Sequence, residues 1–297
     1  MIISASRRTD VPAFYSEWLM NRIETGHCEV PNPLNPKQVT VVSLKPEDVD
    51  VIVFWTRNPS PLLARLKELD RRGYRCLFLY TLTGNPRAME PHRPSLEQTL
   101  KTFKTLSDRI GPDRVTWRYD PLVFTNATGP EFHRETYETI ARHLRGHTRR
   151  SIMSVVKIYR KIGQRITALR KEGIELVECE GEALSDLLKF MAATAQDNGM
   201  TLSSCAQEMD LTSSGILPGK CIDDGLIREV FGVEVSRRKD PSQRKACGCV
   251  VSKDIGMYDT CVYGCAYCYA TTSFDRAKGN YRGHNPEAAA LISRSDS

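Results

Sequence analysis

Three cysteines near the end of the chain have the spacing of a metal-binding loop. Cys261, Cys265 and Cys268 have three residues between the first two and two residues between the last two. A short loop of this kind can place three thiolates around one face of a cubane iron–sulfur cluster. Gly264 gives the loop the backbone freedom to turn its amides toward the sulfides. Three thiolates for four irons leave one iron open to an exogenous ligand, which is typical of a reactive metal site.

A structural zinc ion is the alternative for this loop. Zinc needs a fourth ligand, which Cys247 or Cys249 would have to supply from outside the loop. The spacing therefore favours an iron–sulfur cluster over zinc. A non-catalytic zinc or iron–sulfur protein, with a structural or redox-sensing role, remains open as the alternative to an enzyme.

Four further cysteines precede the loop and form a second candidate set of metal ligands. They are Cys205, Cys221, Cys247 and Cys249. Four thiolates saturate either a zinc ion or a second 4Fe–4S cluster. The spacing is irregular, and Cys-Gly-Cys differs from the zinc knuckle with two intervening residues. The pattern therefore favours a second cluster over zinc.

Strands and helices alternate over the first two thirds of the chain. Apolar runs predict six strands, at residues 2–6, 49–55, 75–82, 114–119, 151–156 and 200–204. Helical patterns lie between them, the clearest at residues 96–110, where apolar residues recur every three or four positions. This alternation predicts a parallel sheet, either in a barrel or in an open doubly wound arrangement.

The composition changes after residue 204, where clustered cysteines, Gly, Pro, Ser and charged residues replace the regular alternation. We therefore expect an α/β part at residues 1–204 and a cysteine-rich metal-binding cap at residues 205–297, packed on the mouth of the sheet. The last residues, 293–297, are expected to be frayed.

Polar residues follow several of the predicted strands. In parallel α/β folds the functional site lies at the carboxyl ends of the strands. The candidates for binding a ligand at this rim are Arg7, Arg8, Asp10, Thr56, Asn58, Arg118 and Asp120. Arginines here suit an anionic or carboxylate-bearing ligand. Arg118 and Asp120 point to the same side of an extended segment, whereas Asp10 has helix capping as an equally good explanation.

The cysteine loop resembles the cluster-binding motif of the radical SAM superfamily, in which the residue before the last cysteine is aromatic, as Tyr267 is here. The whole chain looks like the DUF1848 family, an uncharacterised family with a radical-SAM-like cysteine cluster at its C-terminus. That similarity rests on Ser-Ala-Ser-Arg-Arg-Thr-Asp, Val-Phe-Trp-Thr-Arg-Asn-Pro, Trp-Arg-Tyr-Asp-Pro and Cys-Ala-Tyr-Cys-Tyr-Ala.

The resemblance implies a six-stranded partial TIM-type barrel and a 4Fe–4S cluster whose open iron binds the amino and carboxylate groups of S-adenosylmethionine. It implies reductive cleavage of this cofactor to a 5′-deoxyadenosyl radical that acts on an unknown substrate, with a flavodoxin or ferredoxin as reductant. Tyr267 would lie near the adenine. The motif follows the sixth predicted strand here, whereas in the superfamily it usually follows the first.

Composition limits the remaining possibilities. The 297 residues carry a net charge of +6, which suits phosphate-bearing partners or nucleic acid, but no nucleic-acid-binding module is recognisable. No apolar run is long enough to span a bilayer and no signal-peptide core follows Met1, so we expect a cytoplasmic protein without a membrane partner. Ten cysteines in a reducing compartment favour metal binding over disulfides.

Overall fold

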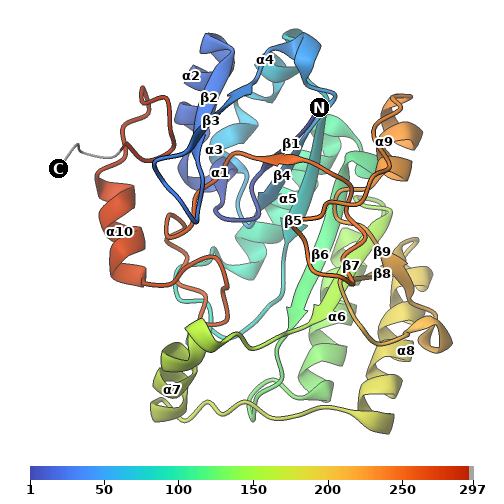
Figure 1. The fold of residues 1–297 in the computed structure, drawn as a ribbon. Coiled ribbons are helices and arrows are strands. Elements are labelled where there is room, and N and C mark those ends of the chain that lie inside the picture. Colours follow the sequence, from blue (N-terminus) through green and yellow to red (C-terminus); the bar gives the residue numbers. More distant parts are fainter. Residues whose placement is uncertain (294–297) are drawn as a thin grey trace.

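Parallel strands in chain order form the centre of the computed structural model, which describes residues 1–293 (Figure 1). Six of them are β1 (Ile2–Ala5), β4 (Val51–Thr56), β5 (Cys76–Thr81), β6 (Val115–Leu122), β7 (Arg150–Val155) and β8 (Thr201–Cys205). They confirm the six predicted strands, with ends shifted by at most three residues. The predicted fraying of the chain end concerns residues outside the described part, apart from Ser293.

Two short strands from the last third of the chain extend the sheet at its edges. β10 (Lys253–Asp254) pairs with β1, and β9 (Leu217–Gly219) pairs with β8, which gives eight parallel strands in the order β10-β1-β4-β5-β6-β7-β8-β9. The expected parallel α/β sheet is confirmed, but the count of six strands is wrong. Within residues 1–293 no pairing closes the sheet into a barrel, because β1 and β8 each pair with an edge strand instead of with each other.

Helices cover one face of this sheet. The main ones are α2 (Ser16–Thr25), α4 (Leu66–Arg71), α5 (Leu96–Ile110), α6 (Pro130–Leu144) and α8 (Gly181–Asp197), and their apolar sides pack on alternate residues of the strands. Helix α5 matches its predicted bounds because its ends are encoded locally. A capping box of Ser95 and Gln98 starts it, and Gly111 ends it.

The opposite face of the sheet packs against the last third of the chain. Ile2, Val51, Val53 and Leu77 of the strands contact apolar residues of α9 (Asp224–Phe231) and of the segment that contains Cys221, Cys247 and Cys249. Since β4 and β5 are therefore buried on both sides, their sequences are almost continuously apolar.

The remaining elements are short. The helices are α1 (Val11–Phe14), α3 (Ser60–Leu63), α7 (Gly163–Lys171) and α10 (Phe274–Arg282); the 3-10 turns are η1 (Pro46–Asp48), η2 (Pro112–Arg114), η3 (Arg160–Ile162) and η4 (Thr212–Ser214). An antiparallel hairpin of β2 (His27–Pro31) and β3 (Val39–Ser43) stands apart from the main sheet. No described helix combines the length and the apolar character needed to cross a membrane.

The C-terminal segment of the described chain packs against α2 and β2. In Figure 1 the segment with α10 lies beside α2 and the β2–β3 hairpin. The Trp18 indole donates a hydrogen bond to the Ala288 carbonyl (2.9 Å), and Glu29 forms a strand-like bridge with Ala290. The last third of the chain is thus attached to the sheet at several places, and the domain boundary at residue 204 stays a prediction.

Candidate functional site

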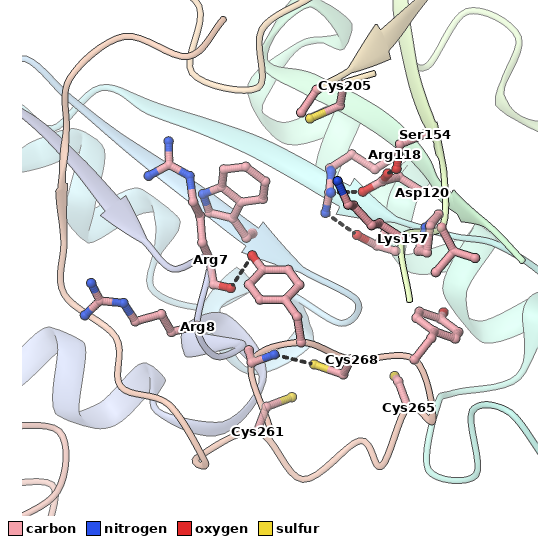
Figure 2. Close-up of a pocket in the computed structure, with 18 of the residues that line it drawn as sticks. Arg7, Arg8, Arg118, Asp120, Ser154, Lys157, Cys205, Cys261, Cys265 and Cys268 are labelled. Carbon is pink, nitrogen blue, oxygen red and sulfur yellow. Dashed lines mark hydrogen bonds and ion pairs between the residues drawn. The ribbon is translucent and has the colours of Figure 1, made fainter. Parts of the chain in front are cut away.

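A cavity of about 250 Å³ lies at the carboxyl ends of the strands, between the two cysteine sets. Six of the seven predicted metal ligands line it: Cys205, Cys247, Cys249, Cys261, Cys265 and Cys268. In Figure 2 the three cysteines of the loop lie on one side and the Arg118–Asp120 pair on the other. The volume is close to the lower end of small-molecule sites, roughly 300 to 1,000 Å³.

Hydrogen bonds fix the shape of the loop that carries Cys261, Cys265 and Cys268. The Cys268 amide donates to the Cys265 carbonyl (3.1 Å), and the Ala270 amide donates to the Cys268 sulfur (3.3 Å). Gly264 has φ +74°, which an L side chain rarely adopts. Arg165 of α7 donates to the carbonyls of Cys265 (3.3 Å) and Cys268 (2.6 Å). The sequence reading missed Arg165, because α7 was not predicted.

Burial makes the loop thiols poor acids on their own. Desolvation raises the pKa of the Cys265 thiol to about 12 and also raises that of Cys261. A bound metal cation reverses this preference, because it attracts the thiolate directly.

The hydroxyl of Tyr267 belongs to a buried polar network centred on Glu90. It hydrogen-bonds to the Glu90 carboxylate and accepts from Arg57 Nη2 (2.8 Å). Thr83 Oγ1 (2.8 Å) and Asn85 Nδ2 (3.0 Å) also donate to Glu90. Desolvation raises the pKa of Glu90, but Arg57 and these hydrogen bonds lower it more, so the carboxylate stays ionised.

Sequence reasoning missed Glu90. It lies in the loop that follows β5, nine residues beyond the end of the strand. An acidic residue in the loop after a strand's carboxyl end was the available signal, but Glu90 lies well beyond the first residues that follow β5.

Arg118 and Asp120 form the expected pair, and both side chains line the cavity. Arg118 Nη2 donates to Asp120, and its Nη1 donates to Thr81 Oγ1 (3.1 Å). Ser154 Oγ donates to the other oxygen of Asp120. Burial lowers the pKa of Arg118, but Asp120 and further neighbouring acidic groups together raise it more, so the guanidinium remains charged. Its Nε atom is buried without a hydrogen-bond partner.

Arg7 and Arg8 also reach the cavity, in different ways. Arg7 lies over the Trp55 ring at 5.3 Å, and Arg118 lies over the same ring at 4.8 Å. Arg8 donates to the Gly256 carbonyl (3.3 Å) and stacks on Tyr258, and it points away from the Arg118–Asp120 pair in Figure 2.

Three other candidates have local structural partners. The Asp10 carboxylate caps α1 by accepting from the Ala13 amide (3.0 Å) and also accepts from the Arg57 amide (2.6 Å). Desolvation raises its pKa to about 7. Thr56 Oγ1 accepts from the Asn58 amide (3.0 Å). Asp10 and Thr56 line the cavity, whereas Asn58 does not.

Asp254 of β10 holds the segment that follows β1. Its carboxylate accepts from Ser4 Oγ (2.9 Å), Ser6 Oγ (2.7 Å) and the Arg7 amide (2.8 Å). The backbone of Gly256 lies close to Ser6, which requires a glycine because a Cβ atom there would lie 2.0 Å from Ser6 Oγ. The sequence did not point to Asp254, because β10 is only two residues long.

The second cysteine set is gathered beside β8. The sulfurs of Cys205 and Cys221 are 3.3 Å apart, and the Ile222 amide donates to the Cys249 sulfur (3.4 Å). Among the described residues, 1–293, no group of three or more His, Cys, Asp or Glu side chains has an arrangement that could hold a metal ion. The metal ligands therefore stay predictions.

Comparison with protein families identifies a relationship along nearly the whole chain. The family model described as "Domain of unknown function (DUF1848)" matches residues 2–270. No match was found among curated proteins. The matched region includes both cysteine sets and every residue that lines the cavity.

Proposed function

We propose that this chain, which belongs to the DUF1848 family, is an iron–sulfur enzyme of the radical SAM type. Cys261, Cys265 and Cys268 would hold a 4Fe–4S cluster, which would supply the electron that cleaves S-adenosylmethionine to a 5′-deoxyadenosyl radical. The observation that carries the proposal is the position of these three thiols, from one loop, around a cavity at the carboxyl ends of parallel strands.

The donor set fits such a cluster. The loop offers three thiols and no fourth ligand, so one iron would remain open to a small molecule in the cavity. Hydrogen bonds from Arg165 and from the loop amides already fix the short segment that carries the three sulfurs. This lowers the entropic cost of gathering the sulfurs around a metal.

Polar groups opposite the loop would orient the cofactor and the substrate. Asp120 is an acceptor for an ammonium group, and the unpartnered Nε of Arg118 is a donor for a carboxylate. The Tyr267 ring lines the cavity and offers an apolar surface, while its hydroxyl is fixed by Glu90. The cysteine-rich segment that begins at residue 205, which includes the loop itself, would act as a cap over this space.

The proposal places the protein in a reducing compartment. Such an enzyme needs a low-potential electron donor, a flavodoxin or a ferredoxin, and a cluster protected from oxidation, so the cytoplasm is the proposed location. The net charge of +6 would also suit a nucleic-acid substrate.

Anaerobic reconstitution tests the function. We expect a brown protein whose reduced spectrum changes when S-adenosylmethionine is added and which slowly releases 5′-deoxyadenosine. Cys265→Ser should lose the cluster and both responses, whereas Cys179→Ser, which alters an isolated cysteine, should keep them. A protein that binds iron but neither responds to S-adenosylmethionine nor releases 5′-deoxyadenosine would support the non-catalytic alternative instead.

A further inference from the structure

The separation of the sulfurs distinguishes two kinds of four-thiolate centre. In a tetrahedral zinc site with Zn–S bonds of about 2.3 Å, neighbouring sulfurs are about 3.8 Å apart. In a cubane cluster each thiolate binds a different iron, so the sulfurs stand much farther apart. The distance between two cysteine sulfurs of one site therefore indicates which centre it can hold.

In the second cysteine set, the distance between two sulfurs is close to that in a site for a single metal ion. The Cys205 and Cys221 sulfurs are 3.3 Å apart. The amide of Ile222, the residue after Cys221, donates to the Cys249 sulfur (3.4 Å), and Cys247 packs in the same buried cluster as these cysteines. All four cysteines thus lie in one cluster on the same face of the sheet. An ion would have to spread Cys205 and Cys221 by only about 0.5 Å to reach the tetrahedral edge.

The loop with Cys261, Cys265 and Cys268 is different. Within the described residues no sulfur–sulfur contact of this kind joins its three cysteines, and the Cys268 sulfur accepts instead from the Ala270 amide (3.3 Å). The two sets therefore have different geometries, although they line the same cavity.

Buried positive charge next to the second set is a separate indication of an anionic centre. The Arg7 side chain is only 10% exposed, and its Nη2 atom is buried without a partner. Arg7 lines the cavity together with Cys249. Four thiolates around a divalent cation carry a net charge of about −2, and the unpartnered Nη2 of Arg7 is a donor for such a centre.

We propose that Cys205, Cys221, Cys247 and Cys249 bind one tetrahedral zinc ion. This departs from the second 4Fe–4S cluster that the sequence spacing favoured. The ion would join the end of β8 to the segments before α9 and before β10, and so fix one wall of the cavity. Zinc is preferred to a single ferrous ion because divalent zinc binds a given site more tightly. The proposal does not depend on the iron–sulfur function of the loop.

Metal analysis of the full-length protein tests this directly. We expect about one zinc per chain in protein purified from zinc-containing medium, in addition to about four irons after reconstitution. X-ray absorption at the zinc edge should show four sulfur neighbours at about 2.3 Å. Cys221→Ser should lower the zinc content at least tenfold and leave iron unchanged, and Cys265→Ser should do the reverse.

Cys179→Ser is the matched control and should change neither metal, because Cys179 belongs to neither set. If Cys221→Ser fails to fold, the metal content and the X-ray absorption spectrum of the unaltered protein still test the proposal. About eight irons per chain without zinc, a single sulfur-bound iron, or a Cys205–Cys221 disulfide in place of a metal would each overturn the proposal.

Discussion

Arg57 and Glu90 form two parallel hydrogen bonds, Nη1 to Oε2 at 2.8 Å and Nη2 to Oε1 at 3.1 Å. The Glu90 side chain is fully buried and the Arg57 side chain is 14% exposed. Because Tyr267 bonds to both residues, this pair attaches the cysteine loop to the ends of β4 and β5. The geometry of the proposed cluster site therefore depends on one buried charge pair.

Replacing Glu90 by Gln should destabilise the protein by about 3 kcal/mol, because it leaves the Arg57 charge buried without its partner. Urea unfolding at neutral pH measures the change. The control is Glu68→Gln, which removes a partly exposed pair with Arg72 and should cost about 0.5 kcal/mol. Equal effects of the two substitutions would show that the Glu90 network does not stabilise the fold.

Replacing Arg118 by Ala should leave the iron content unchanged and weaken binding of S-adenosylmethionine about tenfold, a loss of about 1.4 kcal/mol. The reason is that Arg118 faces the cavity and carries a free donor, but contributes no sulfur ligand. Titration of the reduced protein with S-adenosylmethionine measures affinity. Arg142→Ala, on the exposed side of α6, should behave like the unaltered protein. Loss of iron in Arg118→Ala would indicate a structural role instead.

Gly256→Ala should destabilise the protein by about 1 to 3 kcal/mol. The new Cβ atom would lie 2.0 Å from Ser6 Oγ and 2.5 Å from Ser6 Cβ, so the segment after β1 must shift. Gly279→Ala in α10 is the opposite case, because a Cβ atom there meets nothing within 4 Å. It should stabilise the protein by about 0.5 to 1 kcal/mol. Thermal unfolding of the two variants should therefore shift in opposite directions.

His133 predicts a pH dependence of stability. Burial lowers the pKa of His133 to about 4, and its neutral ring donates from Nε2 to the Val123 carbonyl (3.3 Å) while Nδ1 accepts from Tyr119 (2.9 Å). Between about pH 6.5 and 4 the unfolded chain binds a proton at this residue and the folded chain does not. The free energy of unfolding should therefore fall with falling pH, by about 3 kcal/mol from this residue alone.

Denaturant unfolding at several pH values checks the His133 prediction. In His133→Asn the slope between pH 6.5 and 4 should be smaller than in the unaltered protein, because the titrating group is gone. An equal slope in both proteins would mean that other groups cause the loss of stability.

The local pattern of the sequence was sufficient for the six long strands and for α5. These elements are encoded by apolar periodicity and by caps such as Ser95 and Gln98, which lie within a few residues of one another. The short strands β9 and β10 carry no such pattern. They exist because Ser203 and Ile3, distant in the sequence, offer pairing edges to Leu217 and Lys253.

Part of the site could be predicted from the residues at the ends of the strands. Arg118 and Asp120 were predicted to pair because alternate residues of a strand share a side, and the structure brings them together at the cavity. Asp10 was equally explained as a cap, and it does cap α1. Asn58 follows β4 closely but accepts from the Ser60 amide, outside the cavity lining. Position after a strand does not determine where a side chain points.

The sequence alone determined which thiols lie close together within the loop, because the spacing of Cys261, Cys265 and Cys268 is a local property. It could not determine that Glu90 and Arg57 would anchor this loop, nor that Cys205 and Cys221 would come within 3.3 Å. Those contacts join residues that are up to 210 positions apart, as between Arg57 and Tyr267. Only the packing of the loops and the edge strands around the sheet places such residues together.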